Sequence, residues 1–126
     1  MIKVERGEGF FDYRGLIQDL LTDVKLDSVT LIRTNAGSVR GNHFHAETQQ
    51  WTYVISGGLR VVTRVPGQEE REEFALPGCL FLSPANEHHA WEAVEDCEVL
   101  VFTTGPRSGA DYESDTIRLL DDQRLL

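Results

Sequence analysis

The stretch GSVRGNHFHAETQQWTYVISG, residues 37–57, bears on both the fold and the site. Its His43 and His45 flank Phe44, so on a β-strand both imidazoles project from the same face. Burying either ring without a polar partner costs free energy. A shared metal ion or a hydrogen-bonded acid and base pair would satisfy both rings. A histidine pair alone is more often exposed on the surface and without a function, so it becomes a candidate site only if other segments supply further donors.

A second stretch, GCLFLSPANEHHA at residues 78–90, carries the other two histidines, His88 and His89. All four histidines of the chain therefore fall in two short segments.

Short β-prone runs separated by turn residues fill the middle of the chain. They cover residues 28–34, 50–56, 59–65, 72–76, 79–83, 89–93 and 98–104. Runs of about five to seven residues at intervals of about ten predict an antiparallel sandwich or barrel. Residues 56–58 and 65–68 are the expected hairpin turns, because glycine and proline supply turn conformations. Residues 14–26 and 116–126 suit either a strand or a helical turn, and the absence of repeats or linkers predicts one domain, residues 1–126.

The spacing of residues within the two histidine segments narrows the choice among all-β folds. From Gly37 the chain reads G-x5-H-x-H-x4-Q-x6-G, and from Gly78 it reads G-x5-P-x-N-x2-H. These spacings resemble the two signature motifs of the cupin superfamily, here over residues 37–93. The resemblance implies an all-β, single-domain jelly-roll barrel, the double-stranded β-helix of RmlC-like proteins. It also implies that His88 points outward and that four side chains point into the barrel: His43, His45, Gln50 and His89.

The same resemblance implies a metal site. In cupins the first motif supplies two histidines and a glutamate, and the second motif supplies a third histidine. Here Gln50 replaces the glutamate, and a neutral amide oxygen is a weaker ligand than a carboxylate. The implied ligands are His43, His45, Gln50 and His89, holding a divalent ion such as Zn, Fe, Ni or Mn. In the alternative, the site holds no metal and the histidines act only as general acid and base.

The flanks of the first motif resemble sugar-modifying cupins. VRGNHFH at residues 39–45, followed by Gln50, resembles a block of the nucleotide-sugar 3,4-ketoisomerases, and DYRG at residues 12–15 is similar to an element of the deoxysugar 3,5-epimerases. The resemblance implies an isomerase or epimerase of a keto-sugar, with His43, His45 and His89 moving protons near neutral pH. Two alternatives remain: a metal-dependent cupin dioxygenase, and a non-enzymatic cupin that binds a sugar or another small anion.

Arginine and tryptophan side chains are the candidates for substrate binding. Only Lys3 and Lys25 are lysines among the 12 basic residues, and arginine suits bidentate recognition of phosphate. The candidates for a diphosphate are Arg33, Arg40, Arg60 and Arg64. Ion pairing with the excess of carboxylates is the competing explanation for any one of them. Trp91 lies two residues past His89, so it shares that face and can stack on a ligand.

An aromatic row adjoins the first motif. Trp51, Tyr53 and Ile55 alternate with Gln50, so they face outward if Gln50 faces the pocket. Either a second layer of this chain or another subunit then covers them. Related sugar-modifying cupins pair through their sheets, so the resemblance implies a homodimer.

Composition excludes several other classes of function. The 126 residues include 12 basic and 21 acidic side chains, a net charge of −9, which repels nucleic acid and anionic membranes. No apolar run approaches the roughly 18 residues of a membrane span, and the first residues do not resemble a signal peptide. We therefore expect a cytoplasmic protein. Cys79 and Cys97 lie in apolar surroundings and predict small buried hydrophobes without a disulfide framework.

Overall fold

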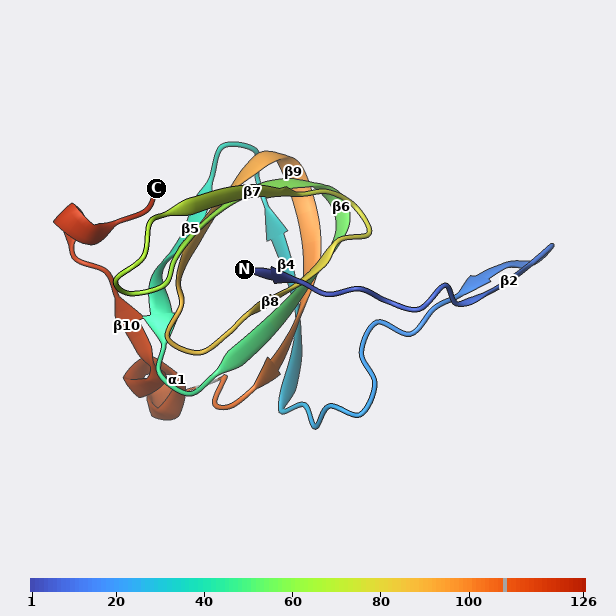
Figure 1. The fold of residues 1–126 in the computed structure, drawn as a ribbon, viewed down its shortest axis with the longest axis horizontal. Helices are drawn as coiled ribbons and strands as arrows, with labels where there is room; N and C mark the ends of the chain where they lie inside the picture. Colours follow the sequence, from blue (N-terminus) through green and yellow to red (C-terminus); the bar gives the residue numbers. More distant parts are fainter. Residues whose placement is uncertain (108) are drawn as a thin grey trace.

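A computed structural model describes residues 1–107 and 109–126. Most regular structure in it is β-strand, which confirms the predicted all-β class (Figure 1). The strands are β1 (Ile2–Lys3), β2 (Phe10–Asp12), β3 (Gly15–Ile17), β4 (Ser28–Thr34), β5 (Val39–His45), β6 (Gln49–Arg64), β7 (Arg71–Ala75), β8 (Leu80–Ser83), β9 (His88–Thr104) and β10 (Thr116–Arg118). The helices are α1 (Gly109–Asp115) and a 3₁₀ turn, η1 (Asp121–Gln123).

Two long strands, β6 and β9, organise the barrel. They pair antiparallel from Gln49 opposite Thr104 to Arg64 opposite His88. The first half of β6 also pairs with β8 and its second half with β7, while β9 pairs with β5 through its first half and with β4 through its second. Each long strand thus serves both layers, and the sheet curves around one core (Figure 1). Strands β1 and β10 extend the edges at β8 and β5.

The expected hairpin turn at residues 56–58 is wrong, because β6 continues through it. Gly57 has a φ of +76°, and the register of β6 against β9 shifts at this point, which is a β-bulge. A Cβ on Gly57 would collide with the Asp96 carbonyl and with Cys97 on β9. The positive φ of glycine therefore bends the strand instead of reversing it. Strand β9 is likewise continuous over residues 94–96, although the sequence predicts separate strands at residues 89–93 and 98–104.

Of the other local expectations, the second turn is confirmed, whereas β5 differs from the runs that the sequence predicts and the two ambiguous end segments contain only short elements. The turn at residues 65–68 is confirmed: the Gln68 amide donates to the Val65 carbonyl at 2.9 Å, and β7 returns along β6. Strand β5 was absent from the β-prone runs because its glycine and asparagine are poor strand formers, and pairing with β9 imposes the conformation. Residues 14–26 contain only the short β3, and residues 116–126 contain β10 and η1.

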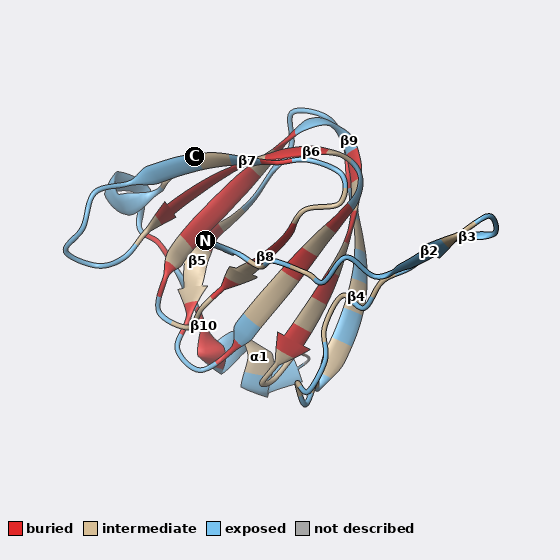
Figure 2. Ribbon diagram, turned by 45° about the vertical axis from the view of Figure 1, so that its right-hand side comes forward, coloured by how far each residue is buried: buried red, intermediate tan, exposed pale blue. Residues whose placement is uncertain are grey.

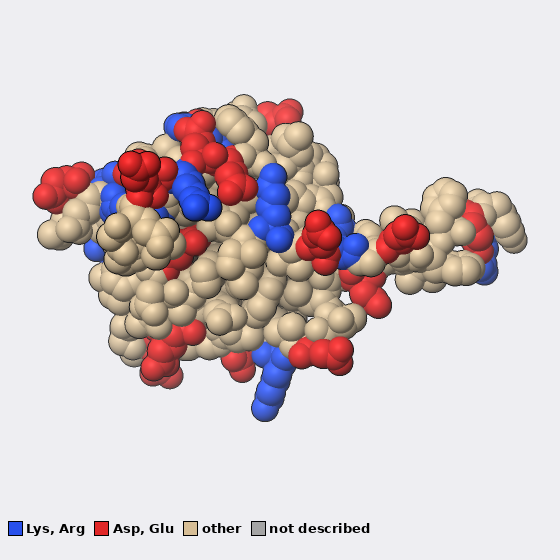
Figure 3. Space-filling model, viewed as in Figure 1, with Lys and Arg blue, Asp and Glu red and all other residues tan. Residues whose placement is uncertain are grey.

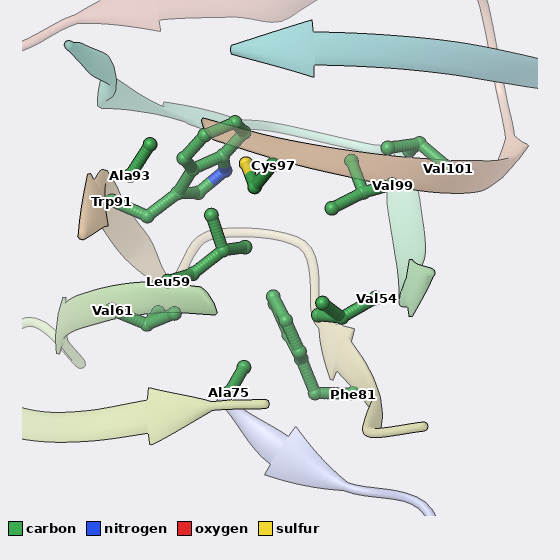
Figure 4. Close-up of a cluster of buried hydrophobic side chains, with 10 residues drawn as sticks. All are labelled: Val54, Leu59, Val61, Ala75, Phe81, Trp91, Ala93, Cys97, Val99 and Val101. Carbon is green, nitrogen blue, oxygen red and sulfur yellow. The ribbon is translucent and has the colours of Figure 1, made fainter. Parts of the chain in front are cut away.

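Alternation along β6 and β9 builds the core. Val54, Leu59 and Val99 are 0% exposed and meet Phe81 and Trp91 between the layers (Figure 4). The same strands alternate buried and partly exposed residues along their length (Figure 2). Each such side chain contributes about 1.5–3 kcal/mol on burial, so this cluster supports the frame that positions the site.

The hairpin formed by β2 and β3 projects from the barrel as an arm, residues 10–17 (Figures 1 and 2). Its two strands form a separate sheet. Most of its large apolar side chains are exposed, including Phe11 at 76%, Tyr13 at 96% and Ile17 at 70%. A two-stranded hairpin without other packing is marginally stable in water, so the arm needs a surface to pack on.

The surface mixes charges. On the face drawn in Figure 3, acidic and basic side chains are interspersed. Within the described part of the chain, no helix is long and apolar enough to cross a membrane.

Candidate active site

Strands β5 and β9 bring the three predicted inward histidines together. His43 and His45 project from β5, and His89 lies directly opposite His43 on β9. The ring of His43 is 4.8 Å from that of His45 and 4.7 Å from that of His89, centre to centre. One nitrogen of each ring lies within 4.8 Å of the other two, close enough to share one ion or exchange a proton.

A bulge in β5 makes this close approach possible. The register against β9 shifts between Gly41 and His43, with Asn42 in the left-handed region at a φ of +57°. Gly41 has a φ of +94°, and a Cβ there would lie 2.8 Å from the His89 carbonyl oxygen. The side-chain oxygen of buried Asn42 accepts hydrogen bonds from the amides of Leu125 and Leu126, which hold the bulge.

All three clustered histidines are neutral at physiological pH. Burial, assisted by the charge of His45 and then Arg118, lowers the pKa of His43 to about 4. Burial and the neighbouring imidazoles lower the pKa of His89 to about 3. Burial also lowers the pKa of His45, although the carboxylate of Asp115 opposes this. A neutral imidazole has one lone pair, which can accept a proton or bind a metal.

Hydrogen bonds determine which nitrogen of each buried histidine ring carries the proton and which carries the lone pair. His89 Nδ1 lies 3.3 Å from the Glu87 carbonyl oxygen, which can only accept, so Nδ1 carries the proton and Nε2 the lone pair. His45 Nδ1 lies 3.3 Å from Thr116 Oγ1, and His45 Nε2 is buried without a hydrogen-bond partner in the described structure. An unsatisfied buried polar atom costs about 1–3 kcal/mol. A metal ion bound at this nitrogen would remove that cost, so the donor set fits a divalent metal.

A cavity of about 330 Å³ opens onto His43 and His89. The structure places Gln50, Trp91 and Arg40 in its lining, so it brings these predicted residues together with the histidines. His45 is 2% exposed and lies outside the lining. His88 lies elsewhere: it stacks on Phe44 with ring centres 4.7 Å apart.

Arg107 and Tyr112 also line the cavity, and sequence reasoning missed them as site residues. The Arg107 guanidinium lies over the Tyr112 ring at 4.8 Å, and the Tyr112 ring lies 5.9 Å from that of His45. Nothing in the local sequence separates Arg107 from the other arginines. Its position depends on where the chain passes from β9 into α1, which only the fold shows.

Three predicted arginines do not line the cavity: Arg33, Arg60 and Arg64. Each forms an ion pair with an acidic side chain, with Glu98, Glu72 and Glu70 respectively. By contrast, neither Arg40 nor Arg107 has a carboxylate within ion-pair distance in the described part of the chain. Arg40 Nε instead donates to Thr34 Oγ1 at 2.8 Å. Two unneutralised cations at one cavity of an acidic protein favour an anionic ligand.

An antiparallel barrel that brings histidines from two strands beside one cavity has the architecture of a small-molecule site. Residues 23–117 match the family described as Cupin, and the chain belongs to that family. The predicted fold is therefore confirmed. No curated protein matches the sequence.

Solved structures with the same fold include sugar-modifying cupins. The sugar 3,4-ketoisomerase QdtA from Thermoanaerobacterium thermosaccharolyticum, solved with TDP, has a TM-score of 0.75 and 19% identity, covering 97% of this chain and 88% of its own. A histidine variant of QdtA has been solved with TDP-4-keto-6-deoxyglucose. A 3,4-ketoisomerase from Helicobacter canadensis has a TM-score of 0.75 and 18% identity, covering 97% and 91%. The dTDP-4-dehydrorhamnose 3,5-epimerase from Sulfolobus tokodaii has a TM-score of 0.75 and 16% identity, covering 94% and 76%. At these identities the likeness concerns the fold.

Proposed function

We propose that this cupin is an isomerase or epimerase of a keto-sugar carried on a nucleoside diphosphate. One observation carries the proposal: neutral histidines line the same cavity as two arginines that have no carboxylate partner among the described residues. The histidines suit proton transfer next to a carbonyl, and the arginines suit the diphosphate. The resemblance to ketoisomerases and epimerases, in fold and in the first motif, agrees with this assignment.

The histidines divide the proton chemistry. His43 lines the cavity and is neutral, so its ring nitrogen accepts the proton from the carbon beside the sugar carbonyl. The electrons of the broken C–H bond pass to the carbonyl oxygen as an enediolate forms. In a ketoisomerase a proton is delivered to the former carbonyl carbon, while the hydroxyl proton of the first carbon passes to the former carbonyl oxygen, so the carbonyl moves by one carbon. In an epimerase a second acid delivers a proton to the first carbon from the opposite face, and the carbonyl re-forms in place. His89, beside His43 in the cavity, is the second group placed to move a proton.

A divalent metal fits the same donors. His43, His45 and His89 would hold it, because one nitrogen of each ring lies within 4.8 Å of the other two and Nε2 of His45 has no hydrogen-bond partner among the described residues. Gln50 would be the proposed fourth ligand, since it lines the same cavity as His43 and His89. A metal bound there would supply positive charge to an enolate oxygen.

Arg40, Arg107 and Trp91 are the proposed substrate-binding residues. The two guanidinium groups offer planar pairs of donors that match phosphate oxygens. The buried Trp91, 9% exposed, forms an apolar wall beside His89.

The test is exchange of solvent deuterium into TDP-4-keto-6-deoxyglucose, followed by NMR in D2O. We expect deuterium next to the carbonyl with the unmodified protein. The variant His43→Asn should lose exchange, while His88→Asn, which alters a histidine outside the cavity, should keep it. No exchange by the unmodified protein, both metal-free and supplied with Fe, Ni, Zn or Mn, would reject the proposal.

The second candidate is a metal-dependent dioxygenase, favoured by the unsatisfied lone pair of His45. Metal content by plasma mass spectrometry, compared with that of His43→Ala, tests the ion itself. Oxygen consumption without deuterium exchange would favour the dioxygenase, and ligand binding with neither activity would favour a binding protein.

A further inference from the structure

Thr116 has two polar neighbours and only one hydrogen to donate. Its Oγ1 lies 2.8 Å from the backbone carbonyl oxygen of Tyr112 and 3.3 Å from Nδ1 of His45. The carbonyl can only accept, so the hydroxyl hydrogen is directed to Tyr112. The contact with His45 is then a hydrogen bond only if the ring nitrogen donates.

We propose that Thr116 is a positioning residue that fixes the tautomer of His45. The Thr116 hydroxyl accepts the Nδ1–H of His45, which keeps the lone pair on Nε2, the nitrogen that is buried without a partner in the described part of the chain. This inference rests on the proposed function only in taking His45 as a group that accepts a proton or an ion.

The junction of α1 and β10 places Thr116. Its hydroxyl bonds back by four residues onto the last turn of α1, and its backbone pairs with His45 across β10 and β5. Side chains directly opposite on antiparallel strands share a face and lie close together. Thr116 is 7% exposed and His45 is 2% exposed, so water does not compete for this contact.

Asp115 anchors the junction. Its carboxylate accepts hydrogen bonds from the amides of Glu47 and Thr48, at 2.8 and 3.1 Å, and from the Thr48 hydroxyl. Burial alone would raise the pKa of Asp115, but these hydrogen bonds outweigh it and lower the pKa, so the anchor is ionised at physiological pH. The loop after β5 and the start of β10 are therefore tied together around His45.

The test is the tautomer itself, read from the long-range 1H–15N correlations of 15N-histidine-labelled protein at pH 7.5 after metal removal. His45→Gln identifies the His45 signals. We expect the Nδ1–H form in the unmodified protein and in Thr116→Ser, which keeps the hydroxyl. Thr116→Val removes the hydroxyl at similar volume and should populate the Nε2–H form. Ser28→Ala, which removes a buried hydroxyl without a partner on β4, should change nothing.

An Nε2–H form of His45 in the unmodified protein would overturn the proposal, as would an unchanged tautomer in folded Thr116→Val. If Thr116→Val does not fold, the tautomer of His45 in the unmodified protein and in Thr116→Ser still tests the proposal. In deuterium exchange, Thr116→Val should lower kcat about 10- to 100-fold with little change in KM, and Thr116→Ser should restore it. The expected tautomer without any exchange would reject the proposed function and leave the role of Thr116 intact.

Discussion

The depressed pKa values of His43 and His89 link stability to pH. The unfolded chain protonates both rings below about pH 6.5, whereas the folded protein does so only near about pH 4 and about pH 3. Above about pH 6.5 both states hold these rings neutral, so titration of the rings does not change the free energy of unfolding. As pH falls below that value, the unfolded chain binds more protons than the folded protein, and the free energy of unfolding decreases.

We predict that the free energy of unfolding of the metal-free protein falls as pH is lowered from 7 to 4. His43→Gln, which cannot titrate, should reduce that slope by about 1 kcal/mol per pH unit. Urea unfolding at several pH values measures both curves. Parallel curves for the two proteins would show that His43 is not held neutral.

The two arginines that line the cavity should contribute to the affinity for a nucleotide. Arg40→Ala and Arg107→Ala should each weaken TDP binding about 10- to 100-fold, because each removes charge-assisted hydrogen bonds to phosphate. Isothermal titration calorimetry measures the change. Arg33→Ala removes the same charge from a side chain paired with Glu98 outside the cavity and should leave the affinity unchanged. Equal losses in all three variants would indicate a general charge effect and contradict the assignment.

At the scale of the element, the bulge of β5 decides whether the histidines meet. Gly41 combines a positive φ with close contact to the backbone of β9. Gly37, just before β5, has a φ of +82° but open space where a Cβ would be. The two positions therefore separate backbone strain from steric collision.

We predict that Gly41→Ala costs more stability than Gly37→Ala. Both variants incur left-handed strain, on the order of 1–3 kcal/mol, and only Gly41→Ala also pushes β5 away from His89. Chemical denaturation gives the two free energies, and the histidine signals in NMR spectra report the cluster. Equal costs and unchanged histidine signals for both variants would show that the close approach is unimportant.

At the scale of the whole molecule, the apolar surface favours a homodimer. Val29 and Leu31 on β4 are 57% and 49% exposed, and Ile55 on β6 is 40% exposed, all on the outer side of the sheet. Part of the aromatic row is covered by the chain itself, since Arg6 lies over Tyr53 at 5.4 Å. The arm adds further exposed apolar side chains. Exposed apolar side chains on a sheet face and on the arm favour an interface.

We predict a solution mass of twice the 14.2 kDa chain, measured by light scattering. The double variant Phe11→Asp and Leu16→Asp places charges on the arm and should give a monomer. Leu120→Asp, at a side chain 68% exposed outside the arm, should remain dimeric. A monomeric unmodified protein would contradict the prediction.

The sequence predicted the barrel and its histidine cluster because both depend on local patterns. Alternation places His43 and His45 on one face whatever the partner strand, and the resemblance of the two motifs to those of cupins adds His89 and Gln50. It failed where a residue type permits two outcomes: Gly57 allows a hairpin or a bulge, and the packing against Cys97 selects the bulge.

The amino-acid sequence by itself therefore determined the all-β class, since strand periodicity is a property of the local chain, and its two motifs carried the resemblance to cupins that implied the family and the inward histidines. Only the tertiary structure decided which arginines face the cavity, because an ion pair across strands cannot be read from spacing. It also brought Arg107 and Thr116 to the site from beyond the motifs. Their contacts arise where β9 passes into α1 and β10 returns along β5, and such long-range pairing depends on the packing of the whole barrel.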